Sequence, residues 1–144
     1  MGDETVLGFD FGMKRIGVSV GEARLGAARA LRVIDHAETA PRFAAIAELI
    51  DEWRPARLVV GRPLNDDGSP HNMTARCERF ANQLRGRHAL PVELVDERFT
   101  SLEADAALRG RGGLSWQARK ARVDAEAARI ILQDWMDRHA QDIA

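Results

Sequence analysis

The sequence contains very little cysteine, since Cys77 is the only one in 144 residues. A single thiol excludes an internal disulfide and favours a reducing compartment, although it can still link two chains. The sequence also lacks the run of about 18 apolar residues that a membrane span needs. Its first residues, MGDETVLGF, lack the basic start and apolar run of a signal peptide. We therefore expect a cytoplasmic protein with no membrane partner.

Net charge is nearly absent too, because 21 basic and 22 acidic residues give a formal value of −1. Nonspecific binding to nucleic acid usually requires a basic balance, so only local clusters of cations can support it here. Two of the basic residues are lysines, Lys14 and Lys120, and the rest are arginines. Arginine suits bidentate contacts with phosphate, but biased codon usage in a GC-rich genome explains the excess equally well.

The sequence also offers no cluster of zinc ligands. The four histidines lie in predicted loops or at helix ends and show no metal-ligand spacing: His36, His71, His88 and His139. No serine sits in a nucleophile-elbow motif. The sequence therefore does not favour a zinc site or a serine nucleophile of that kind.

The pattern of apolar residues predicts eight main elements. Alternation over 5–11, 15–21 and 27–34 is typical of strands, and the short connections between them predict antiparallel hairpins. Helical spacing follows from Pro41 to near Pro55, and a buried strand over 57–61 comes next. A helix around Cys77–Leu84, a strand from Pro91 and a final helix over 116–139 complete the set.

Between the last strand and the last helix, Thr100 and Glu103 fit a capping box that opens a short helix through Leu108. The glycine-rich and arginine-rich segment 109–113 then predicts a mobile basic loop. The whole order indicates an α/β fold, in which a five-stranded mixed sheet, three antiparallel strands then parallel ones, has helices packed on it. We expect one domain, 1–144, since this length supports one core.

Asp10 is the first candidate site residue, because acids are depleted inside strands. Leu7, Phe9 and Phe11 share one face of its strand, and Gly8 and Asp10 share the other. Gly8 is expected to leave open space on Asp10's face. A solvated acid on an edge strand is the competing interpretation, but the apolar neighbours of Asp10 favour a central strand and a site.

Two adjacent acids, Asp96 and Glu97, end the fifth strand and are followed by Arg98. Successive strand residues face opposite sides, so only one of the two can point toward a given site. A surface ion pair with Arg98 is an equally good interpretation of this tripeptide. The residues alone leave the choice between Asp96 and Glu97 open.

Asp124 lies four, seven and eleven residues before Ala128, Ile131 and Trp135. This spacing places it on the apolar line of the last helix that faces the sheet. A carboxylate there is costly unless it is paired or binds a metal. Three acids from separate elements, without a histidine or cysteine cluster, predict an oxygen-rich site for Mg²⁺ or Mn²⁺.

These residues lie in four blocks that together resemble the YqgF family, also called RuvX: LGFDFGMKRIGVSV, LVVGRPLNDDG, VELVDERFTSLEAD and RVDAEAARIILQDWM. The family comprises resolvase-like nucleases with an RNase H-like fold. The resemblance covers nearly the whole chain. It implies that Asp10, Glu97 and Asp124 are the catalytic and metal-binding acids. It also implies that Glu97, rather than Asp96, belongs to the site.

The resemblance further implies maturation of the 5′ end of the 16S ribosomal RNA precursor, with cleavage of branched DNA at Holliday junctions as an alternative. In RNase H-like sheets the fifth strand is not beside the first, so Glu97 must reach across about 10 Å. Two metal ions can bridge part of that gap. The expected contacts with substrate phosphates come from the following cations: Lys14, Arg15, Arg98, Arg119 and Lys120.

Two functions of other classes compete with the nuclease. The first block also resembles the phosphate hairpin of the actin, hexokinase and Hsp70 ATPases, but those folds bind nucleotide between two domains, and this length provides one. A noncatalytic RNA-binding factor for ribosome assembly is the other. The expected partner is nucleic acid, either precursor ribosomal RNA within a pre-ribosomal particle or branched DNA, and the chain acts as a monomer or homodimer.

Overall fold

The computed structural model describes residues 4–65, 67–97 and 116–143, and in the last helix it describes side chains over 123–139. The short helix expected after Thr100 and the basic loop 109–113 lie outside the described residues. Arg98 lies outside them as well, as do the side chains of Arg119 and Lys120.

Five strands form one mixed sheet, as the sequence predicted. They are β1 (Thr5–Phe11), β2 (Ile16–Glu22), β3 (Ala27–Ile34), β4 (Arg57–Pro63) and β5 (Val92–Glu97). β1, β2 and β3 are joined antiparallel, whereas β4 runs parallel to both β1 and β5. The strand order β3-β2-β1-β4-β5 puts β1 at the centre and β4 between β1 and β5. This order confirms that the fifth strand is not beside the first.

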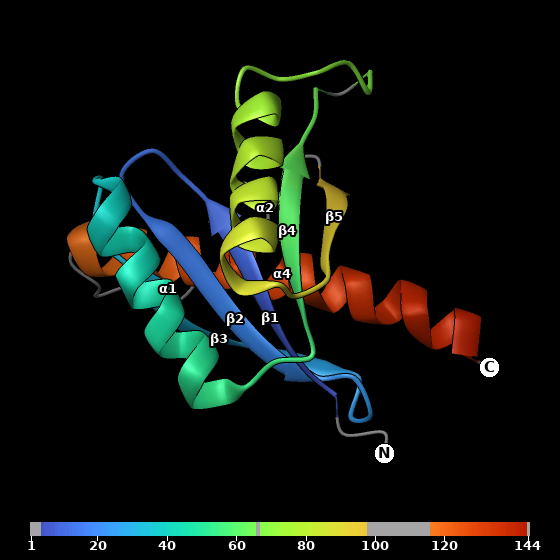
Figure 1. The fold of residues 1–144 in the computed structure, drawn as a ribbon. Helices are drawn as coiled ribbons and strands as arrows, with labels where there is room; N and C mark the ends of the chain where they lie inside the picture. The colour runs from blue at the N-terminus through green and yellow to red at the C-terminus, as the bar shows by residue number, and fades with distance from the viewer. Residues whose placement is uncertain (1–3, 66, 98–115, 144) are drawn as a thin grey trace.

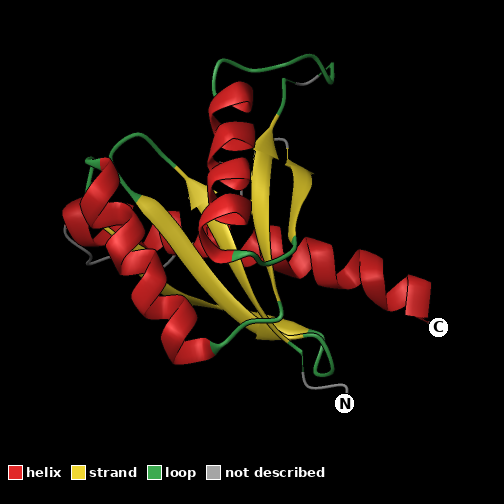
Figure 2. Ribbon diagram, in the orientation of Figure 1, coloured by secondary structure: helices red, strands yellow, loops and turns green. Residues whose placement is uncertain are grey.

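Helices cover both faces of this sheet (Figure 1). α1 (Thr39–Trp53) and α2 (Thr74–His88) pack on one face, and α4 (Trp116–Ile143) crosses the other. Figure 2 shows the resulting three layers, helix, sheet and helix. α1 begins at Thr39, so Pro41 lies in the first turn of the helix, where proline is tolerated. None of the helices in the described part of the chain is long and apolar enough to cross a bilayer.

A separate apolar cluster fills each of the two interfaces. Leu7 and Phe9 of β1 pack with Phe43 of α1 and Phe80 of α2 on one face. On the other face, α4 packs against the sheet through residues that include Ile131, Leu132 and Trp135, together with Val6, Val59 and Val95. The alternation of β1 therefore directs its large apolar side chains toward α1 and α2, and leaves Gly8 and Asp10 on the α4 face.

Small residues allow α4 to lie close to the sheet. A Cβ atom on Gly17 of β2 would lie 1.9 Å from the main-chain oxygen of Asp124. A Cβ atom on Gly8 would lie 2.9 Å from Cβ of Leu132, so the space expected beside Gly8 is filled by the helix. Ser19 Oγ donates a hydrogen bond to the main-chain oxygen of Ala128 at 2.7 Å. These contacts fix the height and position of α4 over β1 and β2.

Candidate active site

Asp10 lies one residue before the end of the central strand, on the face that α4 covers. It pairs in register with Gly17 of β2, the residue that contacts the backbone of α4. Burial, and then the nearby charge of Asp124, raise the pKa of Asp10 from 3.8 to about 7. A carboxyl group with such a displaced pKa at the end of a central strand is a typical feature of a functional site.

Asp124 is positioned by both the sequence of α4 and the glycine beneath it. Ala128, Ile131 and Trp135, the residues on its line, are all buried against the sheet, as their spacing predicted. Because Gly17 contacts the Asp124 backbone and pairs with Asp10, the two acids occupy neighbouring places on one face. Arg15 of the β1–β2 hairpin donates from Nε to Oδ2 of Asp124 at 2.6 Å.

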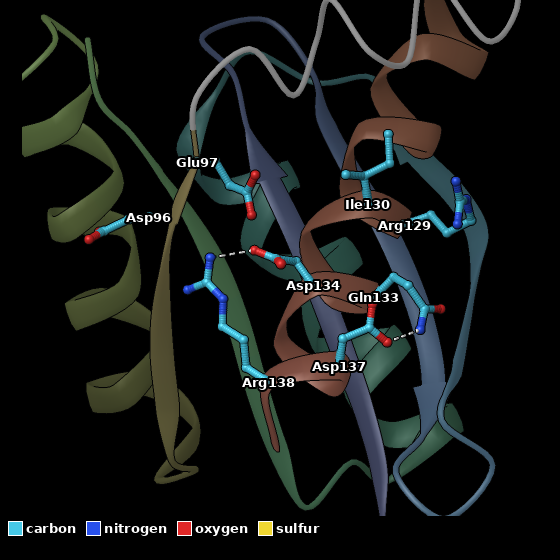
Figure 3. Close-up of a pocket in the computed structure, with 8 residues that line it drawn as sticks. All are labelled: Asp96, Glu97, Arg129, Ile130, Gln133, Asp134, Asp137 and Arg138. Atoms are coloured by element: carbon cyan, nitrogen blue, oxygen red, sulfur yellow. Dashed lines mark hydrogen bonds and ion pairs between the residues drawn. The ribbon is translucent and has the colours of Figure 1, made fainter. Parts of the chain in front are cut away.

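The two acids of β5 point to opposite faces of the sheet, as Figure 3 shows. Asp96 accepts a hydrogen bond from Arg62 Nε at 2.7 Å, and Arg62 also pairs with Glu78 of α2 at 3.1 Å. Glu97 follows Val95, which belongs to the cluster under α4, by two residues and so lies on the α4 face. Of these two acids, only Glu97 shares a face with Asp10 and Asp124.

Glu97 lines a groove of about 710 Å³ between β5 and α4 (Figure 3). The groove is lined with charges of both signs, and several of these are already paired. Arg138 donates to Asp134 at 2.7 Å, and Arg129 donates to Glu126 at 2.6 Å. With four acids and two arginines among its lining residues, the groove has no excess of positive charge that would by itself select an anionic ligand.

The strand order separates Glu97 from the other two acids. β4 lies between β1 and β5, so Glu97 and Asp10 are two strand spacings apart, about 10 Å. Within residues 4–65, 67–97 and 123–139, no three acidic, histidine or cysteine side chains come close enough to hold one metal ion together. In the described structure the three predicted acids therefore share a face of the sheet without forming a closed cluster.

Asp10 and Asp124 nevertheless fit a divalent cation. Two neighbouring carboxylates, one of them with a raised pKa, form a site where positive charge lowers the energy of the ionised pair. Their oxygen donors are those that Mg²⁺ and Mn²⁺ prefer. In this structure Arg15 supplies positive charge to Asp124.

Two of the cations expected to hold phosphates, Lys14 and Arg15, lie in the β1–β2 hairpin. Lys14 is exposed between β1 and β2, and Arg15 is held by Asp124. A further cation, Arg42 of α1, was not among the residues predicted from the sequence; it is buried and donates from Nη2 to the main-chain oxygen of Gly12 at 2.5 Å. Its spacing of three, four and seven residues before Ala45, Ile46 and Leu49 was the available signal, because all three are buried.

A family model described as "RuvX: Holliday junction resolvase" matches residues 4–138. The chain belongs to the RuvX family. Several curated RuvX-like relatives carry the name "Putative pre-16S rRNA nuclease". Those from Burkholderia ambifaria and Burkholderia vietnamiensis are each 53% identical over 135 residues, which cover 94% of this chain and 90% of the relative.

Solved structures related to this RuvX chain show the same fold. Thermus thermophilus RuvC in complex with a Holliday junction substrate has a TM-score of 0.55 and 21% identity, and the match covers 94% of this chain and 96% of that one. Fowlpox virus resolvase in complex with Holliday junction DNA has a TM-score of 0.54 and 5% identity, and the match covers 92% and 98%. The RNase H-like, resolvase-type fold predicted from the sequence is thereby confirmed.

Proposed function

We propose that this chain, a nuclease of the RuvX family, hydrolyses a phosphodiester bond during maturation of the 5′ end of the 16S ribosomal RNA precursor in the cytoplasm. The observation that carries the chemistry is the pairing of Asp10 and Asp124 on one face, with the pKa of Asp10 raised to about 7. The name of the 53% identical relatives supports the choice of substrate.

In this proposal Asp10, Asp124 and Glu97 hold one or two Mg²⁺ or Mn²⁺ ions. When bound, such ions polarise the phosphoryl group, activate water and stabilise the leaving oxygen. Glu97 completes the site once the nucleic acid lies across the sheet edge, because two strand spacings separate it from Asp10. The side chain of Arg15, released from Asp124, is then available for a substrate phosphate.

The cations position the substrate without reading its sequence. Lys14 is exposed in the hairpin immediately after β1, so it lies close in the chain to Asp10 and contacts a phosphate beside the scissile bond. Arg98, Arg119 and Lys120 extend this contact from the segments that follow β5 and begin α4. Arginine and lysine in these places compensate for a chain whose net charge is −1.

Cleavage of a precursor fragment that contains the 5′ end of 16S RNA tests the proposal. The wild type should cleave it in Mg²⁺, and Asp10→Asn should not. Asp51→Asn is the matched control, since Asp51 is an exposed acid on α1, away from the α4 face. Equal cleavage by the wild type and Asp10→Asn would exclude Asp10-dependent hydrolysis.

The description of the family model favours a second substrate, the Holliday junction. A four-way DNA junction should be assayed under the same conditions as the RNA fragment. The ratio of kcat/KM for the RNA to kcat/KM for the junction decides between the two substrates. In cells depleted of the protein, restoration of RNA processing by Asp10→Asn would instead favour a noncatalytic assembly factor.

A further inference from the structure

A second, smaller pocket of about 210 Å³ opens on the opposite side of β1 from the acids. It lies between the start of α1 and the first half of α2, beside the hairpin. Three of its lining residues are arginines, Arg42, Arg76 and Arg79, and none is acidic. The pocket thus has an excess of positive charge, which the groove beside Glu97 lacks.

Arg42 brings a buried positive charge to the base of this pocket, since it is only 6% exposed. Its guanidinium donates to the main-chain oxygens of Gly12 and His36 and lies over the ring of Phe11, 5.2 Å from the centroid. Within the described part of the chain, no carboxylate pairs with it, and burial lowers its pKa. A buried cation held only by neutral partners is costly, and an anion in the pocket would offset that cost.

The pocket floor is aromatic, and its rings pack against one another and against Arg42. Phe80 packs against Phe11 and Phe43, with ring centroids 4.8 Å and 6.0 Å apart, respectively, and Phe43 and Phe80 are buried. A nucleobase stacks on an exposed ring. The chemistry of the pocket therefore suits a phosphate rather than a base.

The rim of the pocket connects it to the hairpin. Arg76 and Arg79 are exposed and three residues apart on α2, so they lie on one face of that helix. Arg76 Nη1 lies 3.5 Å from the sulfur of Met13, which is 51% exposed next to Lys14. Lys14 therefore directly follows, in the chain, a residue that contacts the rim of the pocket.

We propose that this arginine pocket binds a backbone phosphate of the substrate strand that flanks the scissile bond. The inference rests on the proposed nuclease function and adds the path of the strand. From the acids on the α4 face, the strand passes over the hairpin at Lys14 and places its next phosphates between Arg42, Arg76 and Arg79.

The test measures binding in EDTA of an RNA duplex with a single-stranded 5′ extension, as a function of salt, by the full-length protein. Arg79→Gln and the double variant Arg76→Gln/Arg79→Gln each remove rim charge without disturbing the buried Arg42. Arg54→Gln is the matched control, because it removes an exposed arginine about 18 Å away, at the other end of α1. The same extension in DNA, and a blunt RNA duplex, show which kind of strand the pocket takes.

We expect the slope of log K against log[salt] to fall by about 0.7 for each arginine that loses a phosphate, which is about a fourfold loss of affinity at 0.15 M salt. Arg54→Gln should leave the slope unchanged, and the blunt duplex should not distinguish the variants. If the wild type binds normally but the slope is the same for Arg79→Gln, the double variant and Arg54→Gln, the phosphate site in the pocket is excluded. The proposed nuclease function would not be affected by that result. Absence of any salt-dependent binding by the wild type would overturn both the pocket and the proposed function.

Discussion

Arg15 Nε lies 2.6 Å from Asp124 Oδ2, a contact that joins the hairpin after β1 to a helix 109 residues further along the chain. Both side chains are about a quarter exposed or less. The contact occupies one of the carboxylate oxygens that we propose for metal binding. Arg15 therefore stabilises the metal-free protein and competes with the ion for Asp124.

Replacing Arg15 should separate these two effects. We expect Arg15→Gln to bind Mn²⁺ about fivefold more tightly, since about 1 kcal/mol of repulsion between the cations is removed, while the metal-free protein loses about 1 kcal/mol of stability. Isothermal titration calorimetry and urea unfolding measure the two quantities. Lys14→Gln is the control, as it removes the adjacent exposed cation. The same Mn²⁺ affinity in both variants would contradict the competition.

The raised pKa of Asp10 predicts a pH dependence of stability. Because the folded protein holds this proton up to about pH 7 and the unfolded chain loses it near 3.8, stability should fall as pH rises from about 4 to 7 and then level off. Asp10→Asn removes this loss. In EDTA at pH 8 its free energy of unfolding should therefore exceed that of the wild type by roughly 4 kcal/mol. Urea unfolding at pH 4, 6 and 8 checks this, and the two proteins should converge at the lowest pH. A constant difference across the three values would exclude the titration of Asp10 as its cause.

Gly17 should tolerate no side chain. A Cβ atom there would lie 1.9 Å from the main-chain oxygen of Asp124, so α4 must shift away from the sheet. We expect Gly17→Ala to cost about 3 kcal/mol, at the upper end for an overpacked core, and to weaken Mn²⁺ binding by displacing Asp124. Gly86→Ala is the control, because nothing lies within 4 Å of its added atom and alanine favours a helix by about 0.5 to 1 kcal/mol. Comparable unfolding midpoints for the two variants would show that α4 does not rest on Gly17.

Neutralising Glu97 of β5 should lower activity far more than neutralising its neighbour Asp96. We expect Glu97→Gln to lower kcat more than about 100-fold, because loss of a group that only supports a metal ligand already costs about 10- to 100-fold. Asp96→Asn should keep its activity and lose at most about 1 kcal/mol of stability, since it breaks only the partly exposed pair with Arg62. Steady-state kinetics on the precursor fragment measure both. Loss of activity in Asp96→Asn alone would reverse the assignment.

Cys77 should be unreactive in the folded protein. It is 1% exposed, and burial, followed by the charges of Asp10 and Glu78, raises its pKa to about 12. Because the thiolate is the reactive form, a thiol reagent at pH 8 should label the chain only on unfolding in urea. Labelling of the native protein at the rate of a free thiol would contradict this burial. A disulfide between two folded chains through Cys77 is excluded for the same reason.

Much of the fold could be predicted because its signals are local. Alternation in β1 placed Asp10 opposite Leu7 and Phe9, and spacing in α4 placed Asp124 in line with Ala128 and Ile131. Each pattern depends only on residues within a few turns or one strand. The period of a strand also predicted that Asp96 and Glu97 lie on opposite faces. It did not predict which of the two faces holds the site.

Within the described part of the chain, the sequence by itself thus determined the elements, the central strand and which face of its own element each acid occupies. Only the tertiary structure decided how those faces meet: that α4 rests on Gly17, that Glu97 lies two strands from Asp10, and that Arg15 holds Asp124. It also revealed the buried Arg42 beneath the arginine pocket. The physical reason is that periodicity fixes directions within one element, whereas distances between elements depend on which side chains are small enough to let them approach.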